Sequence, residues 1–467
     1  MGPIPFWEFN INTLDIWIYT GIIVVIFLLS NTLRRKVGFI RKSLLPTAVI
    51  GGLIVLVLKS FGLFDSLFNV DEMSEFMEAI TYHTLGLGVI AMALKTNKRE
   101  KNKNANKQVF NAGLLTVNSY LIQAIVGTVV VLLLIVTFMG DLFSASGFLL
   151  PLGFGQGSGQ AASFGSVFED DFGFAGGTSF GLTIAAVGFL VACLIGVAHI
   201  YTMRKKGVIK EAKEVQFTST EVIASPNEVP VTEAVDRMTI QVALIMFVYA
   251  LVFLSIFGIY QLDIGNFGEN TLKPLIRGFN FLLGSIFAIL LKVVFKKLRE
   301  KNIMTRDYPN DYILNRISGF MFDLMIIAGI AAIKIEVLKG LIIPLVIICL
   351  LGAAVTYFYV KKMAYKLFPG YEEPAFISLF GMLTGTTSTG MILLREVDPH
   401  FETPAASNLI YQSFYAIAFG FPLFALLGYA PKGIKETVIA LIVVVVMFVV
   451  FNVVMLRDFI FKKKVKE

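Results

Sequence analysis

The stretches PLGFGQGSGQAAS, residues 151–163, and GMLTGTTSTG, residues 381–390, interrupt two long apolar segments of the chain. Each Gly in a helix interior costs about 1 kcal/mol relative to Ala, so a continuous helix through either stretch is unfavourable. The surrounding segments, at about 147–168 and 374–394, are apolar enough to be buried but too rich in Gly, Ser and Thr for plain helices. The two stretches therefore predict a pair of helical hairpins with broken tips.

The rest of the chain has the composition of a membrane protein. Hydrophobic residues make up 56% of the 467 residues and charged residues 16%, whereas a soluble chain averages about 25% charged residues. The mean hydropathy is +0.77. Because a helix of roughly 20 apolar residues crosses the hydrocarbon core, the sequence predicts spans at 13–33, 44–61, 79–94, 109–139, 174–203, 238–260, 275–294, 313–334, 340–360, 404–429 and 434–456.

Lys and Arg gather in alternate loops between these spans. The basic segments are 34–42, 95–107, 204–213, 292–306, 361–366 and the C-terminal tail, whereas 65–78 is acidic. Since basic loops of membrane proteins face the cytoplasm, we expect a cell-membrane protein with its N-terminus outside and its C-terminus inside. The net charge of +7 then reflects cytoplasmic loops rather than a nucleic-acid partner.

The spans divide into two sets of five. We expect a first repeat at 1–206, a cytoplasmic linker at 207–236, a second repeat at 237–430, and an extra C-terminal span with a basic tail at 431–467. Because five is odd, the second repeat is inverted relative to the first. The predicted fold is an all-α polytopic membrane protein with two inverted five-helix repeats, each with a re-entrant hairpin, and one extra C-terminal helix. This architecture is typical of secondary transporters.

The hairpin tips have the chemistry of a solute-binding site. Backbone that leaves the helix at membrane depth frees carbonyls that can bind Na⁺ and N–H groups that favour an anionic solute. A shift of 228 residues aligns Gly157–Gln160 with Gly385–Ser388, so the tips occupy equivalent positions in the two repeats. Close helix packing through small residues is the alternative explanation. The predicted substrate-binding residues are Gln156, Gly157, Ser158, Gly159, Gln160, Thr386, Thr387, Ser388, Thr389 and Arg395.

Four polar residues have two explanations each. Arg395 could hold a carboxylate through its planar guanidinium, or form an ion pair at the cytoplasmic mouth. Asp323 lies near the middle of a span, where an ionisable group is costly, and either binds a cation or proton or pairs with another helix. Ser119 and Gln123, at i and i+4 on one face, either line a cavity or join helices. The candidate sodium site comprises Gly155, Gly385, Ser119, Gln123 and Asp323.

Other chemistry is not indicated by the sequence. It contains no G-x-x-x-x-G-K-[ST] or H-E-x-x-H motif, so we expect neither an ATP-driven motor nor an enzyme. Cys193 and Cys349 are expected to be small buried hydrophobes. The acidic run Glu169, Asp170 and Asp171 is expected to be a solvated patch on the outer side.

Four motifs occur in one order along the chain: LPTAVIGG at 45–52, TLGL at 84–87, GQGSG at 155–159 and IEVLKGLIIP at 335–344. In this order they resemble the bacterial sodium/glutamate symporter family, whose fold is shared with sodium/citrate-type 2-hydroxycarboxylate carriers. The resemblance covers about residues 13–430. It implies Na⁺-coupled uptake of an anionic amino acid, an elevator-like movement of the hairpin domain, and a homodimer.

The predicted function is sodium-coupled symport of glutamate or a related small carboxylate-bearing solute, with Na⁺ as coupling ion and no organic cofactor. Its partners would be a small anionic solute, membrane lipid and a second copy of the chain. A proton-coupled carrier of another organic anion, a channel or uniporter, and a non-transporting receptor stay open as alternatives. A channel would require polar residues in a continuous line along several spans, which the sequence does not show.

Overall fold

The computed structural model describes residues 6–7, 11–65, 68–95, 103–209, 231–263, 265, 268, 272–304 and 308–460. These residues form helices, turns and loops, with no strand among them. Within this part of the chain, nine helices are long and apolar enough to cross a membrane. The predicted class, an all-α polytopic membrane protein, is therefore confirmed.

The N-terminal half runs from the first span to the end of a long helix at Lys205. Its elements are α1 (Thr13–Lys36), α2 (Gly38–Lys42), α3 (Thr47–Ser60), α4 (Val70–Leu94), α5 (Lys103–Thr137), the 3-10 helix η1 (Ser144–Phe148), the π-helix η2 (Pro151–Gln156), α6 (Ser158–Asp170) and α7 (Gly177–Lys205). Most of the predicted linker, residues 210–230, lies outside the described residues.

The C-terminal half has a similar order of elements. They are α8 (Val231–Tyr260), α10 (Lys273–Gly278), α11 (Asn280–Glu300), α12 (Asp311–Ala332), the 3-10 helix η4 (Glu336–Leu341), α13 (Ile342–Leu367), α14 (Glu372–Leu383), α15 (Thr387–Val397), α16 (Ala405–Leu427), the 3-10 helix η5 (Ala430–Lys432), α17 (Ile434–Met455) and α18 (Arg457–Ile460). All predicted spans of both halves coincide with helices, although several boundaries differ.

The largest boundary difference is at α4, which begins at Val70 although the predicted span begins at 79. The acidic residues of this segment indicate a loop by composition, but they form the first turns of the helix. Asn69 caps the N-terminus, since its side chain accepts hydrogen bonds from the N–H groups of Asp71 and Glu72. Carboxylates near a helix N-terminus are stabilised by the helix dipole, so acidic residues extend this helix.

Both glycine-rich stretches interrupt helices, as the sequence predicts. The first break falls at Gly157, between η2 and α6, where φ is 90° and ψ is −172°. The second falls at residues 384–386, between α14 and α15. The π-helical turn before Gly157 is itself uncommon, and such turns occur frequently at functional sites.

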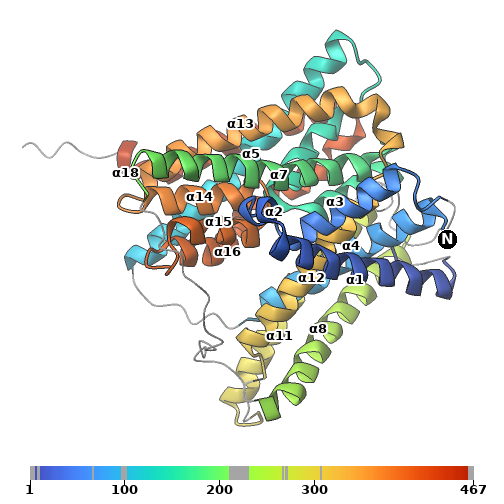
Figure 1. Cartoon of the computed structure of the whole chain (residues 1–467), viewed down its shortest axis with the longest axis horizontal. Helices are drawn as coiled ribbons and strands as arrows, with labels where there is room; N and C mark the ends of the chain where they lie inside the picture. Colours follow the sequence, from blue (N-terminus) through green and yellow to red (C-terminus); the bar gives the residue numbers. More distant parts are fainter. Residues whose placement is uncertain are drawn as a thin grey trace, which may run out of the picture.

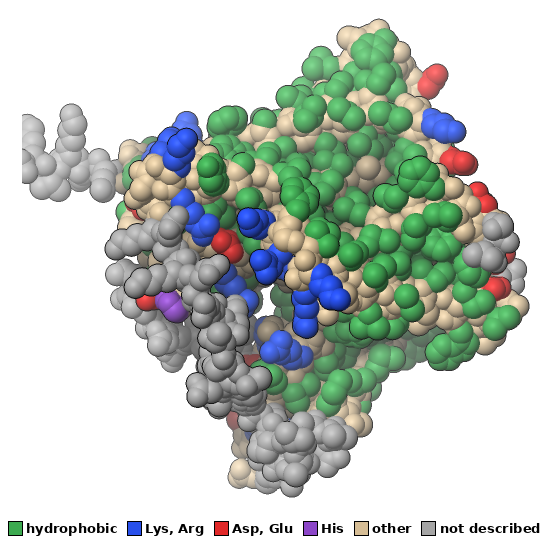
Figure 2. All heavy atoms as spheres, in the orientation of Figure 1, with side chains coloured by type: hydrophobic (Ala, Val, Ile, Leu, Met, Phe, Trp, Pro, Cys, Tyr) green, Lys and Arg blue, Asp and Glu red, His purple; other side chains and the backbone are tan. Residues whose placement is uncertain are grey.

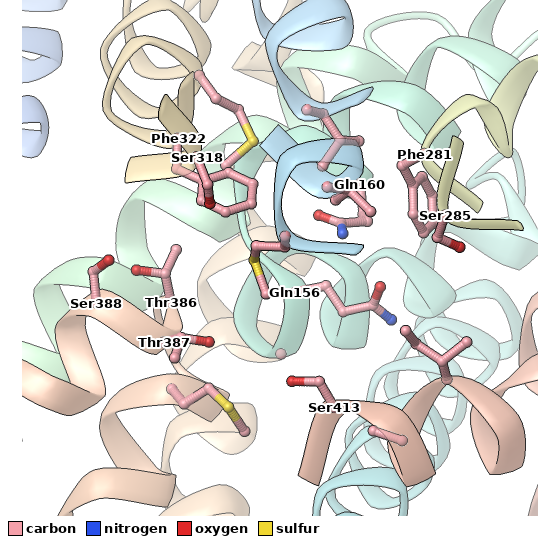
Figure 3. A pocket seen from close by; sticks show the side chains of 18 of the residues that line it. Gln156, Gln160, Phe281, Ser285, Ser318, Phe322, Thr386, Thr387, Ser388 and Ser413 are labelled. Atoms are coloured by element: carbon pink, nitrogen blue, oxygen red, sulfur yellow. The ribbon is translucent and has the colours of Figure 1, made fainter. Parts of the chain in front are cut away.

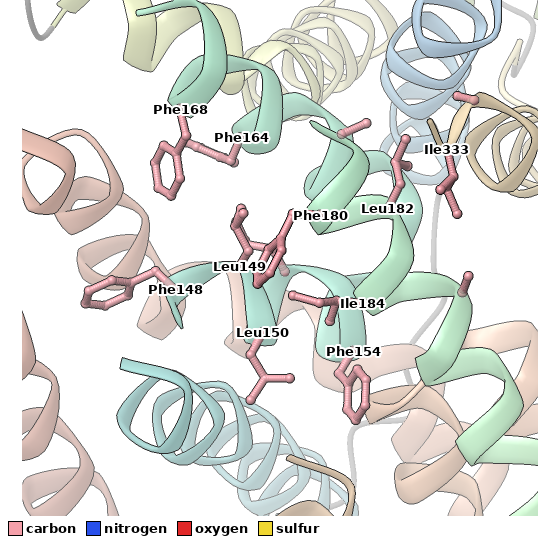
Figure 4. Close-up of a cluster of buried hydrophobic side chains, with 14 of the residues drawn as sticks. Phe148, Leu149, Leu150, Phe154, Phe164, Phe168, Phe180, Leu182, Ile184 and Ile333 are labelled. Atoms are coloured by element: carbon pink, nitrogen blue, oxygen red, sulfur yellow. The ribbon is translucent and has the colours of Figure 1, made fainter. Parts of the chain in front are cut away.

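The N-terminal and C-terminal halves pack against each other along several helices. α4 lies against α12, and α5 lies against α13. In Figure 1, α7 and α13 run across the molecule, α5 crosses them obliquely and packs against α13, and α8 and α11 project together from the rest. The interrupted first segment is buried beneath α7, with its aromatic side chains inside the core (Figure 4). The core therefore surrounds and fixes the helix breaks.

The surface is largely apolar, as expected of a protein whose solvent is lipid. Exposed large hydrophobic side chains occur along α1, α8, α11, α13 and α17. Figure 2 shows hydrophobic side chains over most of one face, with a group of Lys and Arg side chains near α2. Basic residues occupy the last turns of α1, α2, α7, α11 and α13, whereas acidic residues occupy the first turn of α4.

Candidate binding cavity

A cavity of about 380 Å³ lies between the two halves, beside both helix breaks. Its size falls within the range of about 300–1,000 Å³ that is typical of small-molecule sites. Residues from α4, α5, α11, α12 and α16 complete its wall around the two tips. Figure 3 shows Gln156 and Gln160 between Thr386 on one side and Ser285 on the other.

Gly157 sets the geometry of the first tip. Its φ of 90° with ψ of −172° is a backbone conformation that essentially only Gly adopts. The chain then turns into α6, whose first residues pack against α12: Ser158 Oγ donates to the Met325 carbonyl at 3.4 Å. A methyl group on Gly159 would lie 2.5 Å from Met325 Sδ. Gly157, Ser158 and Gly159 are thus buried behind the cavity wall, which Gln156 and Gln160 form.

The second tip presents the N-terminus of α15 to the cavity. Gly385, Thr386, Thr387 and Ser388 all line it. Thr386 caps the helix, because its Oγ1 accepts a hydrogen bond from the Thr389 N–H at 3.4 Å. The N–H groups of the first turn have no partner inside the helix, and the helix dipole makes this end favourable for an anion.

α7 packs closely against both tips. A methyl group on Gly188 would lie 2.5 Å from the Thr384 carbonyl oxygen and 3.0 Å from the Phe154 ring. The absence of a side chain at Gly188 therefore lets α7 approach the second tip and the π-helical turn of the first at once. This close approach fixes the two breaks relative to each other.

Gln123 of α5 connects the second tip to the rest of the core. Its Nε2 donates to Thr356 Oγ1 at 2.9 Å and to the Leu383 carbonyl at 3.0 Å. Its Oε1 is buried without a hydrogen-bond donor, and a methyl group on Gly155 would lie 3.1 Å from it. Gln123 thus places an unpaired amide oxygen beside the first break, and its amide nitrogen is hydrogen-bonded to the second.

The other predicted residues lie away from the cavity wall. Ser119 Oγ donates to the Leu115 carbonyl of its own helix, and Thr389 is buried in α15. Arg395 is exposed and lies over the Phe401 ring at 5.7 Å. Asp323 interacts electrostatically with Arg34 of α1. The structure brings Gly155, Gly385 and Gln123 together, but it does not bring Ser119 or Asp323 to them.

Sequence reasoning missed several polar residues of the wall. Gln412 and Ser413 on α16, Ser285 on α11, and Asn315 and Ser318 on α12 all line the cavity. Gln412 is 2% exposed, and its Oε1 has no hydrogen-bond donor. The available signal was a polar residue inside an apolar span, since such residues usually face the interior of a helical membrane protein.

The acidic run after the first hairpin is exposed at Asp170 and Asp171, as expected of a solvated patch, but all three carboxylates also have partners within the protein. Arg277 of α10, whose side chain is 1% exposed, pairs with Asp170 at 3.1 Å and with Asp171 at 2.7 Å. Glu169 accepts hydrogen bonds from the N–H groups of Gly176 and Thr178 at the start of α7. Burial raises the pKa of the Asp171 carboxyl, and Arg277 opposes that rise.

A multi-pass helical fold with a cavity between broken helices defines a protein of the membrane-transporter class. Nothing among curated proteins matches the chain. The family comparison is positive: the model of the sodium/glutamate symporter family matches residues 12–403. The chain belongs to this family, as the motifs indicate. Membership of a transporter family implies that the protein is not an enzyme.

Proposed function

We propose that the protein is a secondary active transporter for sodium-coupled symport of glutamate or a related small carboxylate-bearing solute across the cell membrane. The observation that carries the proposal is the meeting of the two helix breaks, one from each half, beside one cavity whose wall includes polar side chains near both breaks. A methyl group on Gly157 would lie 3.5 Å from the Gly385 carbonyl oxygen. Broken helices that meet at a midplane cavity are the usual solute site of secondary transporters.

The α-carboxylate of the solute binds at the first turn of α15 in this proposal. Thr387 and Ser388 line the cavity there with their backbone and hydroxyl groups. Hydrogen bonds from N–H groups to a carboxylate are charge-assisted and stronger than neutral ones. Gln156 and Gln160 on the opposite wall contact the remainder of the solute.

Na⁺ binds close to the solute, at oxygen atoms that the helix breaks release. The buried, unpaired Gln123 Oε1 is a ligand of the type that hard cations prefer. Backbone carbonyls at Gly155 and Gly385 would complete the site. Because Gln123 also holds the Leu383 carbonyl, an ion there stabilises both tips, and ion and solute favour the same arrangement.

The order of elements supports two inverted repeats. Five spans and one broken segment precede the linker, and the same series follows it. The basic helix ends of α1, α7 and α13 support a cytoplasmic position for these ends. The N-terminus then lies outside and the C-terminus inside, and the hairpins enter from opposite sides of the membrane.

The broken segments with α4, α5, α7, α12, α13 and α16 would form the moving domain of an elevator-like carrier, and α1, α3, α8 and α11 the scaffold with the contact of a homodimer. The first group packs closely around the tips, whereas α8 and α11 form the projecting pair (Figure 1). A domain that moves as one body carries the cavity across the membrane without opening a continuous pore.

The test is uptake of radiolabelled amino acids, glutamate and glutamine, into proteoliposomes with and without an inward Na⁺ gradient. The proposal predicts accumulation above the external concentration that collapses when an ionophore dissipates the gradient. Uptake driven by an inward H⁺ gradient instead would identify a proton-coupled carrier. Equilibration without accumulation under either gradient would identify a channel or uniporter.

A further inference from the structure

The cavity is almost free of charge. Among the described residues that line it, the one with a charged side chain is Lys95, whose Nζ donates to Asn315 Oδ1 at 3.0 Å. Leu85, ten positions earlier, contacts the first tip, because a methyl group on Gly159 would lie 2.8 Å from Leu85 Cδ1. Asn315, which accepts from Lys95 Nζ, is likewise ten positions from Met325, whose carbonyl accepts from Ser158 of the first tip. Ten helical residues rise about 15 Å, whereas an amino acid with a side chain of glutamate length spans about two extended residues, ~7 Å. An amino acid at the tips therefore does not reach Lys95.

The positive potential at the tips is enough for one carboxylate. A helix N-terminus carries the equivalent of about half an elementary charge. The N-termini of α6 and α15 lie side by side, because Gly157 and Gly385 adjoin, and together they supply about one positive charge. The second carboxylate of a dicarboxylate solute would leave water without a cationic partner, which is costly in a cavity of low dielectric constant.

The side chains that remain are amides with unused hydrogen-bonding capacity. No described residue forms a hydrogen bond with the side chain of Gln156 or Gln160, and Gln156 Nε2 and Gln160 Oε1 are both buried. Each amide offers two N–H donors and a carbonyl acceptor. A carboxylate can accept from the donors but leaves the acceptors unpaired. A carboxamide satisfies both, because it donates and accepts in the same geometry.

The amide oxygen of Gln412 is a third hydrogen-bond acceptor in the cavity wall, and it favours a solute with an ammonium group. Gln412 Oε1 is buried in the wall without a donor, while its Nε2 is engaged with Met382 Sδ at 3.1 Å. Ser413 and Thr387 add hydroxyl oxygens on the same side (Figure 3). These acceptors are neutral amide and hydroxyl oxygens. They suit the ammonium group of a zwitterionic solute, because the carboxylate of the solute itself balances the ammonium charge.

We infer that the cavity selects α-amino acids with one carboxylate and an uncharged carboxamide side chain, of which glutamine is the representative, over dicarboxylates. This inference rests on the proposed transport function and specifies the solute. The α-carboxylate binds the first turn of α15, the ammonium binds acceptors that include Gln412 Oε1, and the side-chain amide pairs with Gln156 and Gln160.

The experiment compares initial rates of Na⁺-driven uptake of radiolabelled glutamine and glutamate, at equal concentration, in proteoliposomes of the full chain. Glutamine should enter at least about tenfold faster, the equivalent of one hydrogen bond of ordinary strength. The isosteric variant Gln160→Met should lose this preference. Gln160→Arg, or Gln156→Arg where the first variant does not fold, supplies a cation and should shift the glutamate-to-glutamine ratio upward by about tenfold or more.

The possible failures are distinguishable. Na⁺-driven uptake of glutamate at a rate equal to or above that of glutamine would overturn the inference and leave the symport proposal standing. Absence of uptake of both amino acids would remove the transport proposal and this inference with it. A parallel thermal-stability assay on the purified protein provides the second readout: glutamine, and not glutamate, should raise the unfolding temperature in the presence of Na⁺.

Discussion

Gly157 and Gly385 lie 228 positions apart in the sequence, yet a methyl group on Gly157 would lie 3.5 Å from the Gly385 carbonyl oxygen. The same two residues align when the sequence is shifted by 228 positions. In the proposed inverted-repeat arrangement, equivalent positions of the two halves would become neighbours where a two-fold axis passes between them. The contact therefore connects the internal similarity of the sequence with the place where the two helix breaks form one cavity.

The variant Gly157→Ala should destabilise the first tip. The backbone there has a φ of 90°, and an alanine in this region costs about 1–3 kcal/mol. Because the added methyl group has 3.5 Å contacts, strain rather than a clash causes the loss. We expect a lower unfolding temperature and slower uptake. Gly140→Ala is the control, since nothing lies within 4 Å of its added methyl group. Equal stability of the two variants would contradict this account.

The variant Gln123→Leu should weaken the sodium dependence of transport. It removes the hydrogen bond to the Leu383 carbonyl, which costs about 1–3 kcal/mol when that buried acceptor loses its donor, and it removes the proposed Na⁺ ligand. We expect the Na⁺ concentration for half-maximal uptake to rise. Ser119→Ala, one turn earlier on α5, removes a bond within the helix and should leave that concentration unchanged. An unaltered Na⁺ dependence in Gln123→Leu would exclude this ligand.

The variant Arg277→Ala should be among the most destabilising substitutions. It removes a guanidinium that is 1% exposed, together with its ion pairs to Asp170 and Asp171 and its hydrogen bond to the Ser166 carbonyl. Because the two carboxylates left behind are partly exposed, we expect a loss of about 1.5–3 kcal/mol, the contribution of hydrogen bonds to a charged group. Arg204→Ala serves as a matched control, because its ion pair with Glu396 is partly exposed and such pairs contribute about 1 kcal/mol or less. Thermal unfolding in detergent compares them. Similar losses in both variants would show that burial of the Arg277 cluster contributes nothing.

Asp398 should contribute stability that depends on pH. Burial tends to raise the pKa of its carboxyl, but the Thr403 hydroxyl and the N–H groups of Thr403 and Glu402 donate to it and hold the pKa below its usual value. A lowered pKa in the folded state means that the stabilisation is fully present above the unfolded value of about 3.9 and is lost as pH falls through the folded value.

The variant Asp398→Asn measures this contribution. Its unfolding temperature should be lower than that of the unaltered protein at pH 7, because the amide nitrogen cannot accept the two bonds from Thr403. The difference should shrink as pH falls below about 4. A difference that stays constant over this range would show that the carboxylate charge has no part in stability.

The sequence predicted the class, the spans and both breaks because each depends on local composition. The apolar segments and the Gly, Ser and Thr clusters at 151–163 and 381–390 carry that information without reference to the rest of the chain. The early start of α4 was also accessible, since Asn69 followed by acidic residues is an N-terminal capping signal. The prediction nevertheless placed this segment in a loop, because its four carboxylates gave it the composition of a loop.

The site was predicted only in part, because its wall depends on contacts between distant segments. The partner of Asp171 is Arg277, 106 residues away, and no local pattern pairs them. Gln412 could have been noticed as a polar residue within an apolar span, but its contribution to the cavity depends on how α16 packs beside the tips. Asp323 drew attention for the same physical reason, yet in the structure it faces Arg34 of α1.

The most direct measurement is an electron cryomicroscopy structure of the protein in lipid nanodiscs with Na⁺ and the transported amino acid. We predict density for the solute against the first turn of α15, between Thr387 and the amides of Gln156 and Gln160, with the ion beside Gln123 Oε1. Solute density at a site that contacts neither helix break would contradict the claim that the meeting of Gly157 and Gly385 creates the transport site.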